Sequence, residues 1–201
     1  MRRRSFLAGG ALFSGIAKAA VTAPRIAGEG RENIPDVLVT DQTGMSHHFY
    51  RDLIRDKMVV INFFYAHCVG ICPRMTSNLL KFQREMAKRM ANRLGRDIFM
   101  YSVSLKPEED TPKHLAAYAE MHGIKRDSGW LLLHAKRRDM ELLRTRLGFR
   151  DSDPVLDADI NEHTGIVRVG SDTTDKWTAL PALGPVSQIV DALFWMDPNK
   201  S

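Results

Sequence analysis

The stretch that most constrains this chain is residues 59–75, where an apolar run leads into two cysteines and a helical pattern. Residues 58–66 are almost all apolar, as expected for a strand that is covered on both faces. Cys68 and Cys72, the only two cysteines, follow at once, and Pro73 then opens a long helical pattern. Proline suits the first turn of a helix, because its missing N–H has no intrahelical partner there. The sequence therefore predicts that both thiols lie on a strand-to-helix connection.

The predicted helix start is a favourable place for cysteine chemistry. Free N–H groups and the helix dipole favour a thiolate over a thiol, and we expect this effect at Cys72. The spacing Cys-x3-Cys differs from the Cys-x2-Cys of thioredoxin-type redox sites. It permits a disulfide, a shared metal ion, or two buried structural thiols. A disulfide that closes so short a loop gains little chain entropy, so stability alone is a poor reason for the pair.

Length and charge indicate one ordinary globular domain. The chain has 201 residues, of which 44% are hydrophobic, which is enough to bury a core. Its formal charge is +5, but four basic residues lie in the first nineteen positions, which contain no acid. Without these four, 25 basic residues face 24 acidic ones, so the rest of the chain is near neutral. We therefore expect solvated helix faces and no nucleic-acid partner.

The N-terminus has the pattern of a targeting segment. Arg3 and Arg4 form a twin-arginine motif, an apolar stretch follows, and Ala17-Lys18-Ala19 has the form of a cleavage site. We expect a signal peptide at 1–19, a linker at 20–34 and a folded domain at 35–198. The apolar stretch is shorter than the ~20 residues of a membrane span. The pattern predicts periplasmic export in the folded state, into an oxidising compartment where thiolates need a reductant.

Hydrophobic periodicity predicts alternating strands and helices in the rest of the domain. Besides the run at 58–66, strands are expected at 37–39, 98–105, 130–134, 163–169 and 176–180, and helices at 73–94, 111–122, 136–147 and 183–196. This order predicts an α/β sandwich with a central mixed sheet. Right-handed crossovers then put the cysteine loop at the carboxyl end of its strand, where such sheets bind ligands.

Three other side chains are of types that can bind a metal ion, namely His47, His48 and Met75. His47 and His48 would face opposite sides of a strand, so they are interpreted as surface histidines in a short hairpin with Phe49 and Tyr50. Met75 could lend a thioether to copper, but its helical spacing is more typical of core filling.

The motifs of the chain resemble the Sco/SenC family. They are Phe63-Phe64-Tyr65-Ala66-His67-Cys68-x3-Cys72-Pro73, then Ser104-x2-Pro107-x2-Asp110-Thr111-Pro112, and then His163 at the opening of a late strand. The motifs occur in the family's order, and the resemblance runs from about residue 36 to 196. It implies a thioredoxin-like three-layer sandwich, a central mixed β-sheet flanked by helices.

The resemblance also implies a function. Members bind one copper ion through two cysteine thiolates and one histidine, which correspond here to Cys68, Cys72 and His163. They deliver copper to the copper-centre subunit of a respiratory cytochrome oxidase or reduce the thiols of that centre, with a periplasmic thiol reductant as a second partner. Two thiolates suit Cu(I), and an added imidazole also allows Cu(II). His67 matches the family pattern too, and its place at the strand edge predicts a supporting or structural role.

The chain departs from the family pattern at three places. Lys106 stands where an acid is usual, Val69-Gly70 stands for Pro-Asp in the cysteine loop, and Glu162 stands for Asp before the expected ligand His163. The lost acid and the gained lysine make the surroundings less negative, which disfavours Cu(II) relative to Cu(I) and could alter the docking face.

The residues leave other functions open. A metallochaperone is a binding protein, whereas the main alternative is an enzyme, a thiol:disulfide oxidoreductase that attacks with the more exposed thiolate of Cys68 and Cys72 and resolves with the other. A peroxide-reducing variant is a further possibility. A zinc site is also compatible with the spacing, although a closed structural zinc site usually has four protein ligands.

Overall fold

The computed structural model describes residues 30–90, 93–151, 153, 155, 157 and 165–199. The expected signal peptide at 1–19, most of the expected linker at 20–34, and His163 lie outside the described residues. Within them, no helix is long and apolar enough to span a bilayer. A short 3₁₀ turn, η1 (Arg31–Asn33), precedes the first strand, and Ile34 after it is already part of the core.

The described residues form one seven-stranded sheet with the strand order β2-β1-β5-β4-β3-β6-β7. The strands are β1 (Leu38–Asp41), β2 (Ser46–His48), β3 (Met58–Phe64), β4 (Ile98–Ser104), β5 (Trp130–Ala135), β6 (Ile166–Ser171) and β7 (Lys176–Pro181). β3, β4 and β5 run parallel, whereas β1 and β6 pair antiparallel with their neighbours. The predicted mixed sheet is confirmed.

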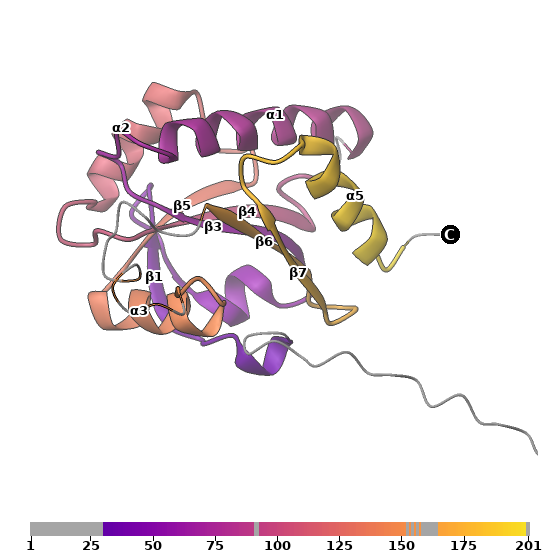
Figure 1. The fold of residues 1–201 in the computed structure, drawn as a ribbon, viewed down its shortest axis with the longest axis horizontal. Coiled ribbons are helices and arrows are strands. Elements are labelled where there is room, and N and C mark those ends of the chain that lie inside the picture. Colours follow the sequence, from indigo (N-terminus) through magenta and orange to yellow (C-terminus); the bar gives the residue numbers. More distant parts are fainter. Residues whose placement is uncertain are drawn as a thin grey trace, which may run out of the picture.

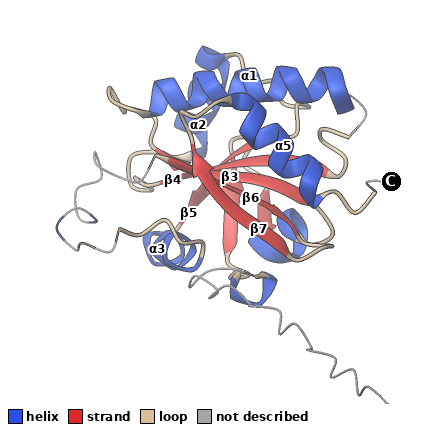
Figure 2. Ribbon diagram, turned by 45° about the vertical axis from the view of Figure 1, so that its right-hand side comes forward, coloured by secondary structure: helices blue, strands red, loops and turns tan. Residues whose placement is uncertain are grey.

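The helices form two layers on the sheet, which gives the three-layer sandwich that the sequence predicted. The helices are α1 (Cys72–Met90), α2 (Pro112–His122), α3 (Arg137–Arg146) and α5 (Val186–Met196). Figure 1 shows α1, α2 and α5 above the sheet and α3 below it. In Figure 2, α1 again lies along the outside of the molecule, with α5 beside it.

Sequence signals explain where α2 begins and ends. The Thr111 side chain accepts a hydrogen bond from the His114 N–H and caps the helix, and Pro112 occupies the first turn. Gly123 ends the helix with a left-handed φ of 71°, a conformation that glycine adopts at little cost. The predicted helix at 111–122 is therefore confirmed almost to the residue.

One local prediction is partly wrong. His47 and His48 do pair back on β1, but Phe49 and Tyr50 do not continue the strand. They begin a six-residue π-helical turn, Phe49–Ile54. Phe49 and Ile54 are both fully buried, so burial of these side chains, and not strand pairing, decides the backbone here.

β3 is the central strand of the fold. All seven of its residues are buried, because β4 and β6 flank it and helices cover both faces of the sheet. A strand buried on both faces needs the continuous apolar run that the sequence shows. The cysteine connection thus starts from the most enclosed strand of the sheet.

Candidate metal centre

The cysteine loop, residues 65–71, joins the carboxyl end of β3 to the first residue of α1, Cys72. On one side β4 runs parallel to β3 and ends level with it, with Phe64 opposite Ser104. On the other side β6 is antiparallel and pairs Ile61 with Arg168, so the register places the start of β6 beside the end of β3. The loop therefore lies where one strand ends and another begins.

The two sulfurs meet in this loop. Cys68 and Cys72 form no disulfide, and both are buried, with 8% and 0% of their surfaces exposed. Their thiols are joined by a hydrogen bond, and the Cys68 N–H donates to the Tyr65 carbonyl. Because a direct thiol–thiol hydrogen bond requires adjacent sulfurs, both can contact one bound ion or close one disulfide.

The thiols differ in acidity. Burial raises the pKa of the Cys68 thiol, but hydrogen bonds from Cys72, Tyr65 and the Gly70 backbone to its sulfur outweigh burial and leave the pKa below its usual value. Burial, together with the hydrogen bond to Cys68, raises the pKa of the Cys72 thiol to about 12. Cys68 is therefore the more acidic thiol of the pair.

The expectation that the helix start makes Cys72 the thiolate is wrong. Cys72 is the first residue of α1, one position before the predicted helix start, but its side chain is completely buried. Desolvation penalises the charged sulfur more than the helix N-terminus favours it. The lowered pKa belongs instead to Cys68, the more exposed of the two residues.

Asp110 supports the loop from the β4 side. Its side chain is 1% exposed, and its Oδ2 accepts hydrogen bonds from the Ala66 N–H at 3.0 Å and from the Ser104 hydroxyl at 2.6 Å. Its Oδ1 is buried and has no hydrogen-bond partner among the described residues. Thr111 caps α2, whereas Asp110 holds Ala66, the residue that precedes His67 and Cys68.

The lysine that replaces the usual acid also lies at this edge. The ammonium of Lys106 is 4.7 Å from the centre of the Tyr65 ring and 3.5 Å from a Glu109 carboxylate oxygen. Tyr65 in turn donates a hydrogen bond to the Cys68 sulfur. Tyr65 thus lies between the ammonium of Lys106 and the Cys68 sulfur. The sequence alone connected Lys106 with the site only through its place in the Ser104–Asp110 motif.

Gly165 supports the loop from the β6 side. A Cβ atom at Gly165 would lie 2.5 Å from Cδ1 of Ile71, so the two residues are in close contact. The Gly165 carbonyl also accepts a hydrogen bond from the Ala182 N–H at 2.7 Å. Because Ile71 immediately precedes Cys72, its contact places Gly165 near the thiols. Gly165 follows His163 by two residues in the sequence.

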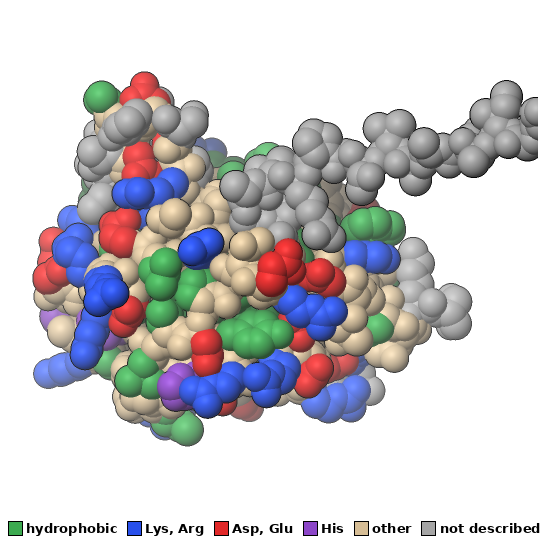
Figure 3. Space-filling view, turned by 90° about the horizontal axis from the view of Figure 1, so that it is seen from below, with side chains coloured by type: hydrophobic (Ala, Val, Ile, Leu, Met, Phe, Trp, Pro, Cys, Tyr) green, Lys and Arg blue, Asp and Glu red, His purple; other side chains and the backbone are tan. Residues whose placement is uncertain are grey.

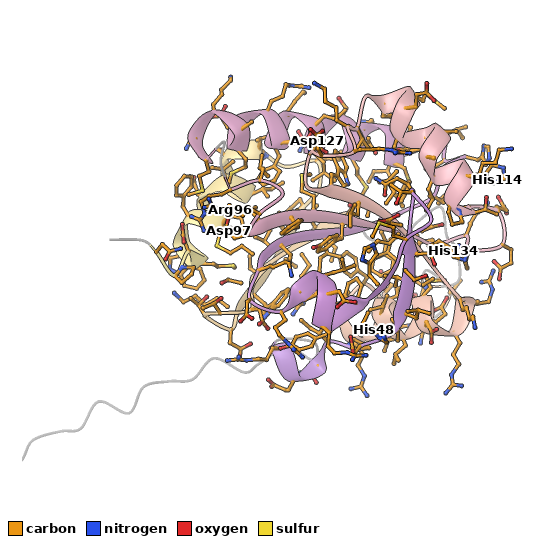
Figure 4. The ribbon with its side chains drawn as sticks, turned by 180° about the vertical axis from the view of Figure 1, so that it is seen from behind. His48, Arg96, Asp97, His114, Asp127 and His134 are labelled. Atoms are coloured by element: carbon orange, nitrogen blue, oxygen red, sulfur yellow. The ribbon has the colours of Figure 1, made fainter. Side chains whose placement is uncertain are left out.

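The remaining candidates do not complete a metal site in the described part of the chain. Met75 is fully buried in the core, as its spacing predicted. His47 is hydrogen-bonded to Asp41, and His48 lies on another side of the molecule from His114 in Figure 4. His67 is exposed, and its ring centre is 6.4 Å from that of His114. Among the residues that the structure describes, no three Cys, His, Asp or Glu side chains are grouped as a metal site would require.

Comparisons with known proteins agree with this geometry. The SCO1/SenC family model matches residues 37–128, and a search of curated proteins found no match. A SCO1/SenC family lipoprotein from Bacillus anthracis str. Ames has a TM-score of 0.64 and 20% identity over 81% of this chain and 94% of its own. ScoI from Bradyrhizobium japonicum, solved with copper bound, has a TM-score of 0.60 and 19% identity over 80% and 96%.

A third structure is BsSco, described as a member of the Sco family of cytochrome c oxidase assembly proteins with a disulfide switch. It has a TM-score of 0.60 and 18% identity over 78% of this chain and 90% of its own. At these identities the structures show the fold alone. The matched range of the family model includes the cysteine loop and the Ser104–Asp110 motif. Residues 37–128 thus match the SCO1/SenC family model, within a chain that has the fold of the solved Sco proteins.

Proposed function

We propose that the protein is an exported copper metallochaperone of the Sco/SenC type that binds one copper ion through Cys68, Cys72 and His163. The observation that carries the proposal is the pair of free, buried thiols at the connection from β3 to α1, joined by a hydrogen bond, since adjacent sulfurs can share one soft cation such as Cu(I). Copper is the cargo of such a protein, and ScoI of the same fold holds it.

The third ligand is supported by the contact between Gly165 and Ile71. His163 precedes Gly165 by two residues, and two residues of chain span at most about 7 Å. Ile71 is adjacent to Cys72, so the length of chain between Gly165 and position 163 is compatible with the proposed histidine ligand. A nitrogen donor added to two thiolates makes a set that holds Cu(II) as well as Cu(I).

The proposed destination is the copper-centre subunit of a respiratory cytochrome oxidase, in keeping with the description of BsSco as an oxidase assembly protein. Export by the twin-arginine route is supported by the pattern of residues 1–19. Mass spectrometry of the exported protein, expected to begin near Ala20, checks this location. In an oxidising compartment a thiol reductant must keep both sulfurs able to bind metal.

Copper titration of the reduced protein tests the ligand set. Wild type should bind one Cu(I) or one Cu(II), and the oxidised protein should bind neither, because a disulfide removes both sulfur ligands. His163→Ala should lose Cu(II) binding at least tenfold, while Cu(I) is retained more weakly by the two sulfurs. The reduction potential of the Cys68/Cys72 pair should change little.

His67→Ala is the matched control, because His67 is the exposed histidine next to Cys68. It should bind Cu(II) like wild type. Unchanged copper affinity in His163→Ala, together with a collapse of disulfide exchange, would show that the metallochaperone proposal is wrong.

A second function is favoured by the unequal thiols. Cys68, with a lowered pKa and 8% of its surface exposed, and the fully buried Cys72, with a raised pKa, are suited to attack and resolution in a thiol:disulfide oxidoreductase. This activity needs only the two sulfurs. It would therefore persist in His163→Ala, which separates it from copper binding in the same titration.

A further inference from the structure

The exposed face of α1 is strongly basic although the domain is near neutral. The helix contains five basic residues and one acid, Glu85. Four of the basic residues follow one another at spacings of seven, three and four positions, which put them on one face of a helix. We call this set the α1 stripe; it consists of Arg74, Lys81, Arg84 and Lys88.

The α1 stripe is not neutralised by the helix itself. All four side chains are exposed. Glu85 is 3.8 Å from Lys88 and 2.8 Å from Arg89, whereas Arg74, Lys81 and Arg84 form no ion pair with the residues that the structure describes. At 1.5 Å per residue the stripe is about 21 Å long. It begins two residues after Cys72 in the sequence.

Clefts border the stripe on the side of α5. Pro73, Arg74, Lys81 and Leu183 line one of ≈ 400 Å³, and Asn78 holds its far wall by donating to the carbonyls of Ala182 at 2.8 Å and Gly184 at 2.9 Å. A second cleft of ≈ 400 Å³ shares Lys81 and is lined by three further basic side chains, Arg84, Lys88 and Arg89.

Exposed apolar side chains lie where the stripe begins. Val69, at the tip of the cysteine loop, is 100% exposed, and Leu183 is 38% exposed. An apolar centre with charged residues at one border is the usual anatomy of a protein–protein interface. The opposite face differs, because Figure 3 shows acidic and basic side chains mixed over the side of the molecule that carries α3.

We infer that the cysteine loop and the α1 stripe together form a docking surface for an acidic protein that exchanges copper or disulfide with Cys68 and Cys72. This inference rests on the proposed function only in using those two sulfurs. Basic charge along one side of the thiols attracts an acidic face from a distance and fixes its orientation as it arrives. The polar helix face that the sequence suggested to be merely solvated thereby selects the partner.

Exchange with charged peptide disulfides tests the inference without copper. The probes are two peptides of equal length with one cysteine each, joined to thionitrobenzoate, one with four Glu and the other with four Lys. The Cys68 thiolate attacks the peptide sulfur, a Cys68–peptide disulfide forms, and thionitrobenzoate leaves with the electron pair. Cys72 then loses its proton to the buffer and displaces the peptide thiolate. The rate of thionitrobenzoate release is the readout.

The reduced wild type should react about tenfold faster with the acidic peptide at low salt, and high salt should remove most of the preference. Arg74→Glu/Lys81→Glu should abolish or reverse it. The matched control is Arg138→Glu/Arg146→Glu, which reverses two exposed charges of α3 on the other side of the sheet. The control should keep the preference.

Equal preference in the two double variants would overturn the inference. The inference would also be overturned if Arg74→Glu/Lys81→Glu kept the peptide preference but lost binding to phosphatidylglycerol vesicles. The surface would then serve to bind a membrane. In either outcome an unchanged copper stoichiometry would leave the proposed metal site intact.

Discussion

The cysteine loop is held differently by its two neighbouring strands. From the β4 side it receives a buried carboxylate, whose Oδ2 bonds the Ala66 N–H and the Ser104 hydroxyl. From the β6 side it receives a packing contact between Gly165 and Ile71. Hydrogen bonds to a buried charge depend on direction, whereas an apolar contact tolerates small shifts. The start of the loop is therefore fixed, and the residue before Cys72 is free to adjust.

Removing the carboxylate should have the largest effect. Asp110→Ala leaves the Ala66 N–H and the Ser104 hydroxyl without a buried partner, and hydrogen bonds to charged groups contribute about 1.5–3 kcal/mol each. Because the unpaired Oδ1 disappears as well, we expect a net loss of about 2 kcal/mol in the free energy of unfolding. Urea unfolding of the reduced protein measures it, with an unchanged m value.

Asp110→Asn is the companion variant. It keeps an acceptor oxygen for the same two donors and should recover at least half of the loss. An Asn variant as unstable as the Ala variant would mean that the charge, and not the hydrogen bonds, holds the loop.

A change within the loop should have the next largest effect. Cys72→Ala removes the side-chain hydrogen bond to the Cys68 sulfur, so the pKa of Cys68 should rise toward its ordinary value. Alkylation by iodoacetamide follows the thiolate, and its rate rises as the pH passes the pKa. The pH midpoint of Cys68 alkylation should therefore move to higher pH, and the reaction at neutral pH should slow.

The reciprocal variant, Cys68→Ala, controls for this result. Its remaining thiol is buried and should stay nearly unreactive at pH 8. Rapid alkylation of Cys72 in this variant would contradict the assignment of Cys68 as the more acidic thiol.

The packing contact should give the smallest effect. Gly165→Ala forces the end of the Ile71 side chain to move, which we expect to cost about 1 kcal/mol in stability. Ile71→Val removes the atom that clashes. The double variant should therefore show a favourable coupling between the two positions in urea unfolding, and strict additivity would mean that the two residues do not touch.

Much of the fold could be predicted because its signals are local. The apolar run of β3, the helical spacing after Pro73 and the glycine at position 123 each report a property of a few adjacent residues. The antiparallel turn at β2 was predicted only in part, since the burial of Phe49 and Ile54 depends on distant elements.

The site was less predictable for the same reason. Proximity of two cysteines follows from their spacing, but which sulfur is buried depends on how α1 sits on the sheet. Likewise, the Ser104-x2-Pro107-x2-Asp110 pattern was visible, while the bond from Asp110 to Ala66 crosses between two strands. Sequence reasoning named the residues of the motif and could not say what each one touches.

The enclosure of β3 has a consequence for motion. Amide protons of a strand buried on both faces exchange with solvent only when most of the domain opens, whereas loop amides exchange through small local openings. The Ala66 amide, bonded to Asp110 at the end of β3, lies at the boundary between these regimes. A local opening of the loop beyond it therefore does not require the sheet that anchors the loop to open.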